Sequence, residues 1–253
     1  MLWDMHVHLD FMQEPREIAR EAEALGLGMF AVTVTPQGYL QVFPAVETAA
    51  NIQLGVGLHP WWVADGRAGL EEASHTAELI QNIRFVGEIG LDASPKHVPE
   101  GSIPIQAKAF EIICAACAES SKTETPKVLS LHSVKAGSLT LDILEKTGCL
   151  QKCRCIFHWF TGSGNELNRA IKAGCMFSLN EMMLKTRRGR EYARQIPADR
   201  LLLETDLPPG QNVPFSASEI SASLERTLTE INDIRRMDLR QKITDNAKKL
   251  VSN

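Results

Sequence analysis

Residues 2–10 read LWDMHVHLD and place two histidines, His6 and His8, one residue apart. The stretch has neither a helix cap nor an amphipathic period, so we predict a strand over residues 2–6. Alternate residues of a strand point to one face, so both imidazoles should point the same way, into the fold. Asp4 lies two positions before His6 on that face, where we expect it to fix the tautomer of a histidine.

The same stretch favours one of two α/β folds. Seven more apolar strands follow, over residues 29–34, 52–56, 84–89, 128–132, 154–158, 176–179 and 201–204. Helical patterns alternate with them, over residues 14–24, 41–50, 69–81, 105–119, 138–147, 165–173, 189–195, 217–230 and 237–251. Eight strand–helix units without a linker predict a single (β/α)8 TIM-barrel domain over residues 1–253. An open doubly wound sheet is the alternative, but it usually carries a glycine-rich loop where this chain has HVHLD.

Composition narrows the class of protein further. The chain has 253 residues, 44% of them hydrophobic, and a net charge of −4, which gives no overall attraction to nucleic acid or to anionic membranes. It has no apolar run of membrane-spanning length, and its first residues lack the features of a signal peptide, so we expect a cytoplasmic protein, monomeric on its own. In that compartment the six cysteines should be reduced thiols rather than disulfides or a zinc knuckle.

Most of the histidines coincide with strand ends. Five of the seven lie at or just beyond the end of a predicted strand: His6, His8, His59, His132 and His158. The other two, His75 and His97, fall in a helix and a loop, and we expect both on the surface. A lone histidine at a strand end is usually structural. Five at one barrel rim indicate a functional site, because barrel active sites are built there.

Two carboxylates occupy equivalent places. Glu88 lies in VGEIGLD near the end of the fourth predicted strand, and Asp206 follows the eighth in LLLETDLPP. A charged residue at the end of an apolar strand costs free energy unless it is paired or binds a cation. Each alone could cap a helix or form a salt bridge, but together with the histidines they favour a metal site. More than four nitrogen and oxygen ligands indicate two divalent ions, Mg²⁺, Mn²⁺ or Zn²⁺.

Six short motifs lie at these strand ends: HVHLD at 6–10, GLHP at 57–60, VGEIGLD at 86–92, SLHS at 130–133, HWFTGS at 158–163 and LLLETDLP at 201–208. In this order they resemble the TatD family of metal-dependent nucleases, within the amidohydrolase-like barrel hydrolases. Three further stretches, VTVTP at 32–36, FSLNEMML at 177–184 and RGR at 188–190, resemble the TatD-type nucleases of Qat anti-phage defence cassettes.

The resemblance implies a role for each residue at the rim. One ion would be held by His6, His8 and Asp206, the other by His132 and His158, and Glu88 would bridge both. Asp206 would also take the proton from the attacking water, and His59 would contact the scissile phosphate. Glu88, Asp206 and His59 would therefore be the catalytic residues.

Basic residues near the rim are the expected contacts to a polyanionic substrate. The family often carries an arginine two positions after the histidine of the SLHS motif, whereas this chain has Val134 and then Lys135. That phosphate contact is therefore lost or moves to Lys135. Beyond the seventh strand, MLKTRRGREYAR supplies Arg187, Arg188 and Arg190, which we expect to track a phosphate backbone, the alternative being a solvated helix start.

Three tryptophans closely follow a motif histidine: Trp61, Trp62 and Trp159. They could stack nucleobases, or they could pack beneath the rim.

The leading hypothesis is a two-metal phosphodiesterase that cuts DNA, with RNA as a second substrate, in anti-phage defence. Its partners would include proteins of a Qat-type cassette. A second hypothesis is a metal-dependent hydrolase of a small ester, amide or phosphoester. A third is a nucleic-acid-binding subunit of a defence complex with little turnover.

Overall fold

The computed structural model describes residues 1–211 and 213–252, and every strand in this part of the chain runs parallel to its neighbours. The strands form a three-stranded sheet, β1-β2-β3, and a six-stranded sheet, β4 to β9 in sequence order. Their bounds are β1 (Leu2–Val7), β2 (Leu27–Ala31), β3 (Ile52–Leu54), β4 (Val56–Leu58), β5 (Phe85–Asp92), β6 (Val128–Val134), β7 (Arg154–His158), β8 (Met176–Leu179) and β9 (Leu201–Leu203).

Backbone hydrogen bonds join the two sheets at two places. At one junction the amide of Glu88 donates to the carbonyl of Thr33 at 2.9 Å, and at the other the amide of Asp206 donates to the carbonyl of His6 at 2.9 Å. Only Gly55 separates β3 from β4, so these two strands occupy one position in the ring. The eight positions expected from the sequence are therefore present, and the (β/α)8 barrel is confirmed.

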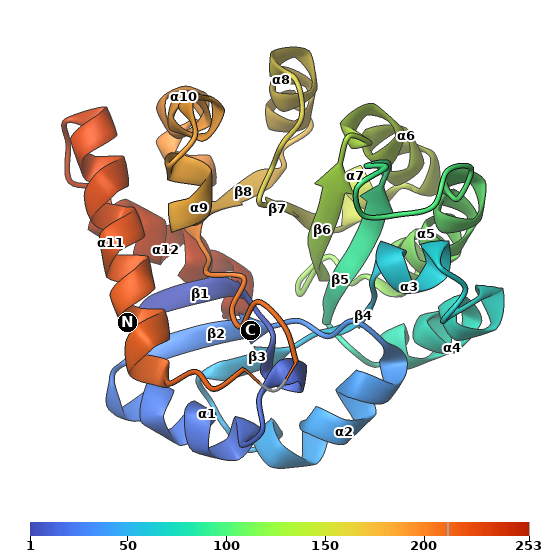
Figure 1. The fold of residues 1–253 in the computed structure, drawn as a ribbon, viewed down its shortest axis with the longest axis horizontal. Helices are drawn as coiled ribbons and strands as arrows, with labels where there is room; N and C mark the ends of the chain where they lie inside the picture. Colours follow the sequence, from blue (N-terminus) through green and yellow to red (C-terminus); the bar gives the residue numbers. More distant parts are fainter. Residues whose placement is uncertain (212, 253) are drawn as a thin grey trace.

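Helices surround the strands as an outer ring (Figure 1). Their bounds are α1 (Pro15–Ala24), α2 (Pro36–Val46), α3 (Pro60–Ala64), α4 (Leu70–Ile80), α5 (Ile103–Ser120), α6 (Gly137–Thr147), α7 (Cys149–Lys152), α8 (Gly164–Lys172), α9 (Glu181–Leu184), α10 (Arg187–Gln195), α11 (Ala217–Arg235) and α12 (Arg240–Val251), with 3-10 turns η1 (Leu9–Phe11) and η2 (Ala198–Arg200). Among the described residues, no helix combines the length and the apolar character needed to span a bilayer.

Some elements differ from those expected from the sequence. The helix expected over 41–50 is α2, which begins earlier because Pro36 opens it and the Thr35 hydroxyl accepts from the Gly38 amide at 3.0 Å. The fourth strand continues past residue 89 to Asp92, because β6 pairs with it as far as Val134. The helices α3, α7 and α9 were not predicted, since four or five residues are too few to show a helical period.

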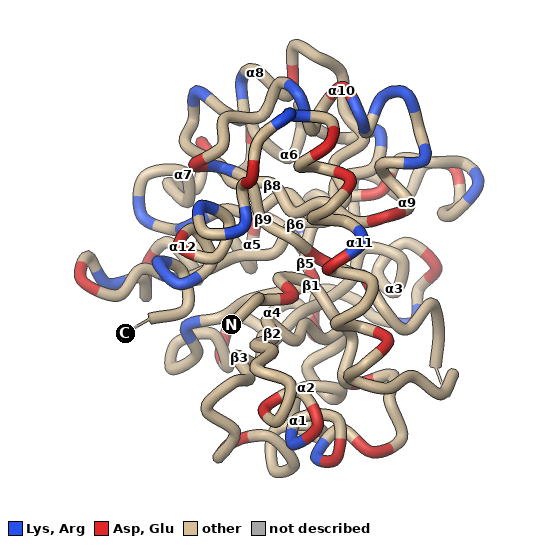
Figure 2. The backbone as a smooth tube through the Cα atoms, turned by 90° about the vertical axis from the view of Figure 1, so that its left-hand side faces the viewer, with Lys and Arg blue, Asp and Glu red and all other residues tan. Residues whose placement is uncertain are grey.

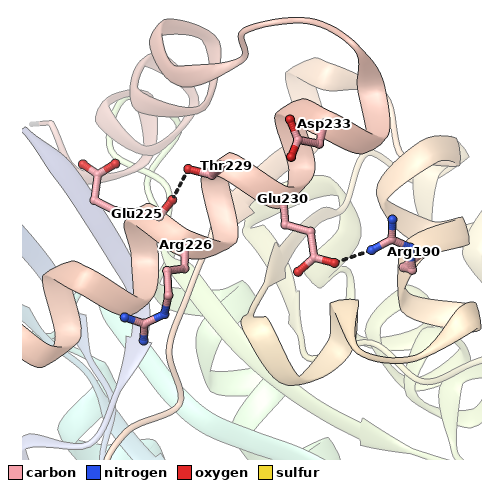
Figure 3. A pocket seen from close by; sticks show the side chains of 6 residues that line it. All are labelled: Arg190, Glu225, Arg226, Thr229, Glu230 and Asp233. Atoms are coloured by element: carbon pink, nitrogen blue, oxygen red, sulfur yellow. Dashed lines mark hydrogen bonds and ion pairs between the residues drawn. The ribbon is translucent and has the colours of Figure 1, made fainter.

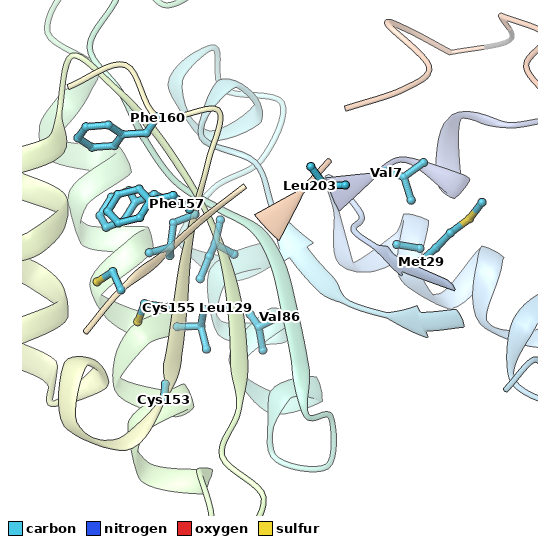
Figure 4. Close-up of a cluster of buried hydrophobic side chains, with 14 of the residues drawn as sticks. Val7, Met29, Val86, Leu129, Cys153, Cys155, Phe157, Phe160 and Leu203 are labelled. Atoms are coloured by element: carbon cyan, nitrogen blue, oxygen red, sulfur yellow. The ribbon is translucent and has the colours of Figure 1, made fainter. Parts of the chain in front are cut away.

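Apolar side chains pack between the strands and the surrounding helices. Figure 4 shows part of this core, in which Cys153 and Cys155 lie among residues such as Leu129 and Phe157. All six cysteines are buried free thiols, as expected. No candidate group of metal ligands among the described residues includes a cysteine, so the thiols belong to the core.

Candidate metal centre

Glu88 lies at the middle of the site. Its carboxylate faces five histidines, through His6 Nε2 at 3.4 Å, His8 Nε2 at 3.4 Å, His59 Nε2 at 3.2 Å, His132 Nδ1 at 2.6 Å and His158 Nε2 at 2.9 Å. Asp206 joins them, with Oδ1 3.5 Å from His6 Nε2 and 3.4 Å from His8 Nε2. The structure thus brings together all six expected metal ligands, and His59, at the carboxyl ends of the strands.

Backbone strain is concentrated at the same rim. Four non-glycine residues in the described part of the chain have a positive φ, and three of them lie one to three residues beyond a strand of the site: Lys135 at 52°, Trp159 at 37° and Asp206 at 58°. Such conformations cost of order 1–3 kcal/mol each and cluster at functional sites. The positions of these three residues indicate that the rim keeps its geometry at some cost in stability.

Asp4 does not fix a histidine tautomer, so that expectation was wrong. Its carboxylate instead accepts from the amides of His6 at 3.1 Å and Thr205 at 3.0 Å, and from the Thr205 hydroxyl. The outer nitrogen of His6, Nδ1, contacts Ser130 Oγ at 2.7 Å. Asp4 therefore ties β1 to the segment after β9, and the Ser130 hydroxyl orients the ring of His6.

Asp92, which the sequence did not single out, performs the orienting role for His132. Its Oδ2 contacts His132 Nε2 at 3.1 Å and His97 Nδ1 at 2.9 Å, and it accepts from Trp61 Nε1 at 2.7 Å. Burial alone would raise the pKa of Asp92, but the hydrogen bonds from His132 and Trp61 outweigh it and hold the pKa well below its usual value. An ionised Asp92 accepts the Nε2 proton of His132, so Nδ1, which lies 2.6 Å from Glu88 Oε1, is the nitrogen that would bind an ion.

Two further carboxylates lie behind His8 and His158. His8 Nδ1 is 3.5 Å from Asp10 Oδ1, and His158 Nδ1 is 3.8 Å from Glu204 Oε1. Burial would lower the pKa of both histidines, but the surrounding carboxylates, Glu88 among them, raise it well above 6.5. Because a metal binds the neutral ring, an ion at these histidines would displace protons.

His59 differs from the other four histidines. Its Nδ1 accepts from the backbone amide of Trp61 at 3.1 Å, at the start of α3, so its neutral ring carries the proton on Nε2. Burial lowers the pKa of His59 to about 4, although Glu88 opposes the shift, and the ring is neutral at pH 7. His59 therefore presents a hydrogen-bond donor to the site rather than a lone pair.

The side chains fit a centre with more than one cation. Three overlapping groups of side-chain nitrogen and oxygen atoms each lie within 4.8 Å of one another: His6 with His8 and Asp206, His6 with Glu88 and His158, and His59 with Glu88 and His132. His6 Nε2 is buried without a hydrogen-bond partner, as expected of an atom placed to bind a metal ion. Burial raises the pKa of Glu88 and Asp206, but the histidines outweigh it and keep both carboxylates ionised. The nitrogen and oxygen donors suit zinc, manganese or magnesium.

A pocket of about 710 Å³ opens above this cluster. Its walls include the three tryptophans named from the sequence, together with Phe11 and His97. His97, expected on the surface, is 38% exposed at its side chain and also lines this pocket. Trp62 and Trp159 in addition pack against the hydrophobic core.

The basic residues expected to bind substrate lie outside the pocket wall at different places. Lys135 is exposed just after β6. Figure 2 shows basic segments around α9 and α10, where Arg187 and Arg188 line a neighbouring hollow of about 560 Å³. Arg188 Nη1 donates to the carbonyl of Thr161, a pocket residue, at 3.3 Å. Arg190 points elsewhere and is ion-paired with Glu230 on α11 (Figure 3).

Comparison with known proteins shows which family this chain resembles. The family model described as TatD related DNase matches residues 3–252. The human protein named Deoxyribonuclease TATDN3 is 22% identical over 268 residues, covering 98% of this chain and 94% of its own length. Deoxyribonuclease Tat-D of Schizosaccharomyces pombe is 32% identical over 200 residues, covering 74% of this chain and 62% of its own length.

Solved structures show the same fold. The crystal structure of YJJV, a TatD homologue from Escherichia coli, superposes with a TM-score of 0.79 at 18% identity, over 98% of this chain and 97% of that one. A TatD family hydrolase from Entamoeba histolytica gives a TM-score of 0.76 at 17% identity, over 98% of this chain and 97% of that one. With the family model matched over nearly the whole chain and its histidine and carboxylate motifs gathered at one rim, the protein belongs to the TatD family of metal-dependent hydrolases.

Proposed function

We propose that this protein is a two-metal phosphodiesterase that hydrolyses DNA, with RNA as a second substrate. The observation that carries the proposal is the position of Glu88, whose single carboxylate faces five histidines beside Asp206. Relatives named for their substrates support it, including a protein of Dickeya dadantii named 3'-5' ssDNA/RNA exonuclease TatD, 31% identical over 156 residues.

The six ligands divide into two sets that share Glu88. His6, His8 and Asp206 would hold one ion, and His132 and His158, whose Nδ1 and Nε2 lie 3.4 Å apart, would hold the other. Two such ions would supply positive charge for the phosphoryl oxygens and lower the pKa of the attacking water. Mg²⁺, Mn²⁺ and Zn²⁺ all accept this mixture of imidazole and carboxylate.

Asp206 and His59 have separate roles, as a proton acceptor and as a hydrogen-bond donor. The carboxylate of Asp206 is ionised and 22% exposed at its side chain, so it can accept a proton from water that enters the pocket. His59 is neutral with its proton on Nε2, so it donates a hydrogen bond to a phosphate oxygen beside Glu88. The shared carboxylate of Glu88 sets the spacing between the two ligand sets.

The strand would leave the pocket past Lys135 and past the hollow lined by Arg187 and Arg188. These guanidinium and ammonium groups can follow a phosphate backbone without reading sequence. Arg190 is excluded from this path, because its charge is paired with Glu230.

We also propose a role in anti-phage defence beside partner proteins of a Qat-type cassette. The support is the resemblance of the stretches at 32–36, 177–184 and 188–190, together with the complete ligand set. Phage plating on cells that carry the cassette with wild-type or Glu88→Ala protein tests this role. Equal protection of cells with the wild-type and the Glu88→Ala protein would refute a defence role for the metal centre.

The experiment follows single-stranded DNA after addition of manganese or magnesium to chelator-treated protein. Wild type should cut the DNA, and a Glu88→Ala, His132→Ala double variant should not. His75→Ala is the matched control, since His75 lies on α4 outside the pocket, and it should retain activity. Cleavage of small esters or amides in place of DNA, or equal cleavage by the double variant, would refute the proposal.

A further inference from the structure

Trp61 stands apart from the other tryptophans of the pocket. Trp62 and Trp159 pack against the hydrophobic core, and the guanidinium of Arg67 covers the ring of Trp62 at 3.9 Å from its centroid. Among the described residues, the core cluster and the side chains packed on it do not include Trp61. Packing beneath the rim therefore accounts for Trp62 and Trp159 but not for Trp61.

The ring of Trp61 is nevertheless held firmly. Its indole N–H donates to the buried carboxylate of Asp92 at 2.7 Å. Its ring centroid lies 5.2 Å from that of His97, which contacts the same carboxylate oxygen at 2.9 Å. One buried anion thus fixes two aromatic rings side by side in the wall of the pocket, before any ligand arrives.

The position of this pair beside the proposed phosphate site indicates its ligand. Trp61 is two residues from His59, in the first turn of α3, and its ring meets that of His59 edge-on at 5.0 Å. It also meets the ring of His132 edge-on at 6.1 Å. A planar group attached to a phosphate bound at His59 would therefore reach Trp61 directly. The pocket volume of about 710 Å³ leaves room for such a group.

We propose that the indole of Trp61, with the His97 ring beside it at an interplanar angle of 50°, forms a stacking shelf for the nucleobase next to the scissile phosphate. The indole N–H and His97 Nδ1 are both engaged by Asp92, so the shelf offers ring surface rather than these atoms for reading base edges. Base–aromatic stacking tolerates every base, because each base has a π-face. The shelf therefore selects nucleotides over other phosphodiesters without selecting sequence. This inference rests on the proposed phosphodiesterase function.

The test compares an intact single-stranded oligonucleotide with two abasic ones. One lacks the base on the 5' side of the scissile bond, and the other lacks the base on the 3' side. Wild type should prefer the intact strand, by kcat/KM, by about 5- to 150-fold, the range that base–aromatic stacking produces. In Trp61→Ala this preference should fall toward one, whereas Trp61→Phe should keep most of it. Phe43→Ala is the matched control, because Phe43 is exposed on α2 outside the pocket, and it should keep the full preference.

A second readout separates this inference from the proposed function. Fluorescence anisotropy with Ca²⁺ gives the Kd of the same intact and abasic strands without requiring cleavage. A Kd preference that Trp61→Ala abolishes, without cleavage by wild type, supports the shelf and refutes the nuclease. Cleavage with an unchanged preference in Trp61→Ala refutes the shelf and leaves the nuclease standing. No preference by wild type in either readout also refutes the shelf.

Discussion

Replacing Asp92 by asparagine tests how the protein prepares His132 for a metal. The substitution keeps the shape of the side chain but removes its charge and turns one acceptor oxygen into a donor. In the structure one oxygen accepts from the Ser94 amide at 2.7 Å, and the other faces His132 and Trp61. Either orientation of the amide therefore places a donor against at least one other donor.

The magnitude follows from these contacts. Hydrogen bonds to a charged group contribute about 1.5–3 kcal/mol each, and Asp92 accepts such bonds from the side chains of His132 and Trp61. Loss of the outer partner of a metal-binding histidine typically lowers metal affinity about 10- to 100-fold, or about 1.4–2.7 kcal/mol. In Asp92→Asn we expect the affinity for one of the two ions to fall about 10- to 100-fold. Activity should recover when metal is in excess.

The assay is calorimetric titration of Mn²⁺ or Zn²⁺ into chelator-treated protein, followed by kcat/KM as a function of metal concentration. Asp65→Asn is the matched control, because Asp65 pairs with Arg67 at 2.6 Å and contacts no proposed ligand. The control should bind both ions as wild type does. Affinities of Asp92→Asn within twofold of wild type for both ions would refute the reasoning.

Three further predictions concern metal binding, a buried thiol and the contacts to nucleic acid. A ligand present at one hundred times its Kd stabilises a protein by about 2.7 kcal/mol, so chelation should lower Tm by about 5–11 °C in differential scanning calorimetry; an unchanged Tm would contradict metal binding to the folded state. Burial raises the pKa of Cys114 from 9.0 to about 11, so the unfolded chain loses this proton first. This thiol alone should therefore lower the free energy of unfolding by about 1.4 kcal/mol per pH unit between these values, and equal urea midpoints below pH 9 and near pH 11 would exclude the effect. Arg188→Gln should reduce the salt slope of single-strand binding by about 0.7, whereas Arg190→Gln should leave the slope unchanged; anisotropy titrations across salt concentration distinguish them.

The barrel and the meeting of the six candidate ligands at one rim could be predicted because both depend on local patterns. Apolar runs of strand length alternate with helical periods, and parallel strands of a barrel bring their carboxyl ends to one rim. Residues far apart in sequence, such as His6 and Asp206, thus meet in the structure because each follows its own strand. The motif around each residue was sufficient to place it.

Contacts between separate elements could not be predicted in this way. Asp92 lies three residues beyond the expected end of its strand, and its partners His132 and Trp61 come from two other strand–helix units. The spacing of Asp4 and His6 predicted a contact with a histidine ring. The chain after β9 instead passes close enough for Thr205 to donate hydrogen bonds to the Asp4 carboxylate. Only the closed ring of strands decides which of these partners comes within reach.

The basic residues of α10 show a second limit. Arg188 and Arg190 are two residues apart, which on a helix rotates them by about 200°. One guanidinium consequently reaches the carbonyl of Thr161 at the pocket, while the other meets Glu230 on α11. Their clustering in sequence therefore did not imply a shared surface, although the helical period could have separated them.

The most direct test of the central claim is the metal content of the protein. Chelator-treated wild type and Glu88→Ala are dialysed against Mn²⁺ or Zn²⁺ and then examined by elemental analysis. A carboxylate shared by two ligand sets predicts about two ions per wild-type chain and fewer in Glu88→Ala. One ion or none in wild type, or two in Glu88→Ala, would contradict the two-metal centre.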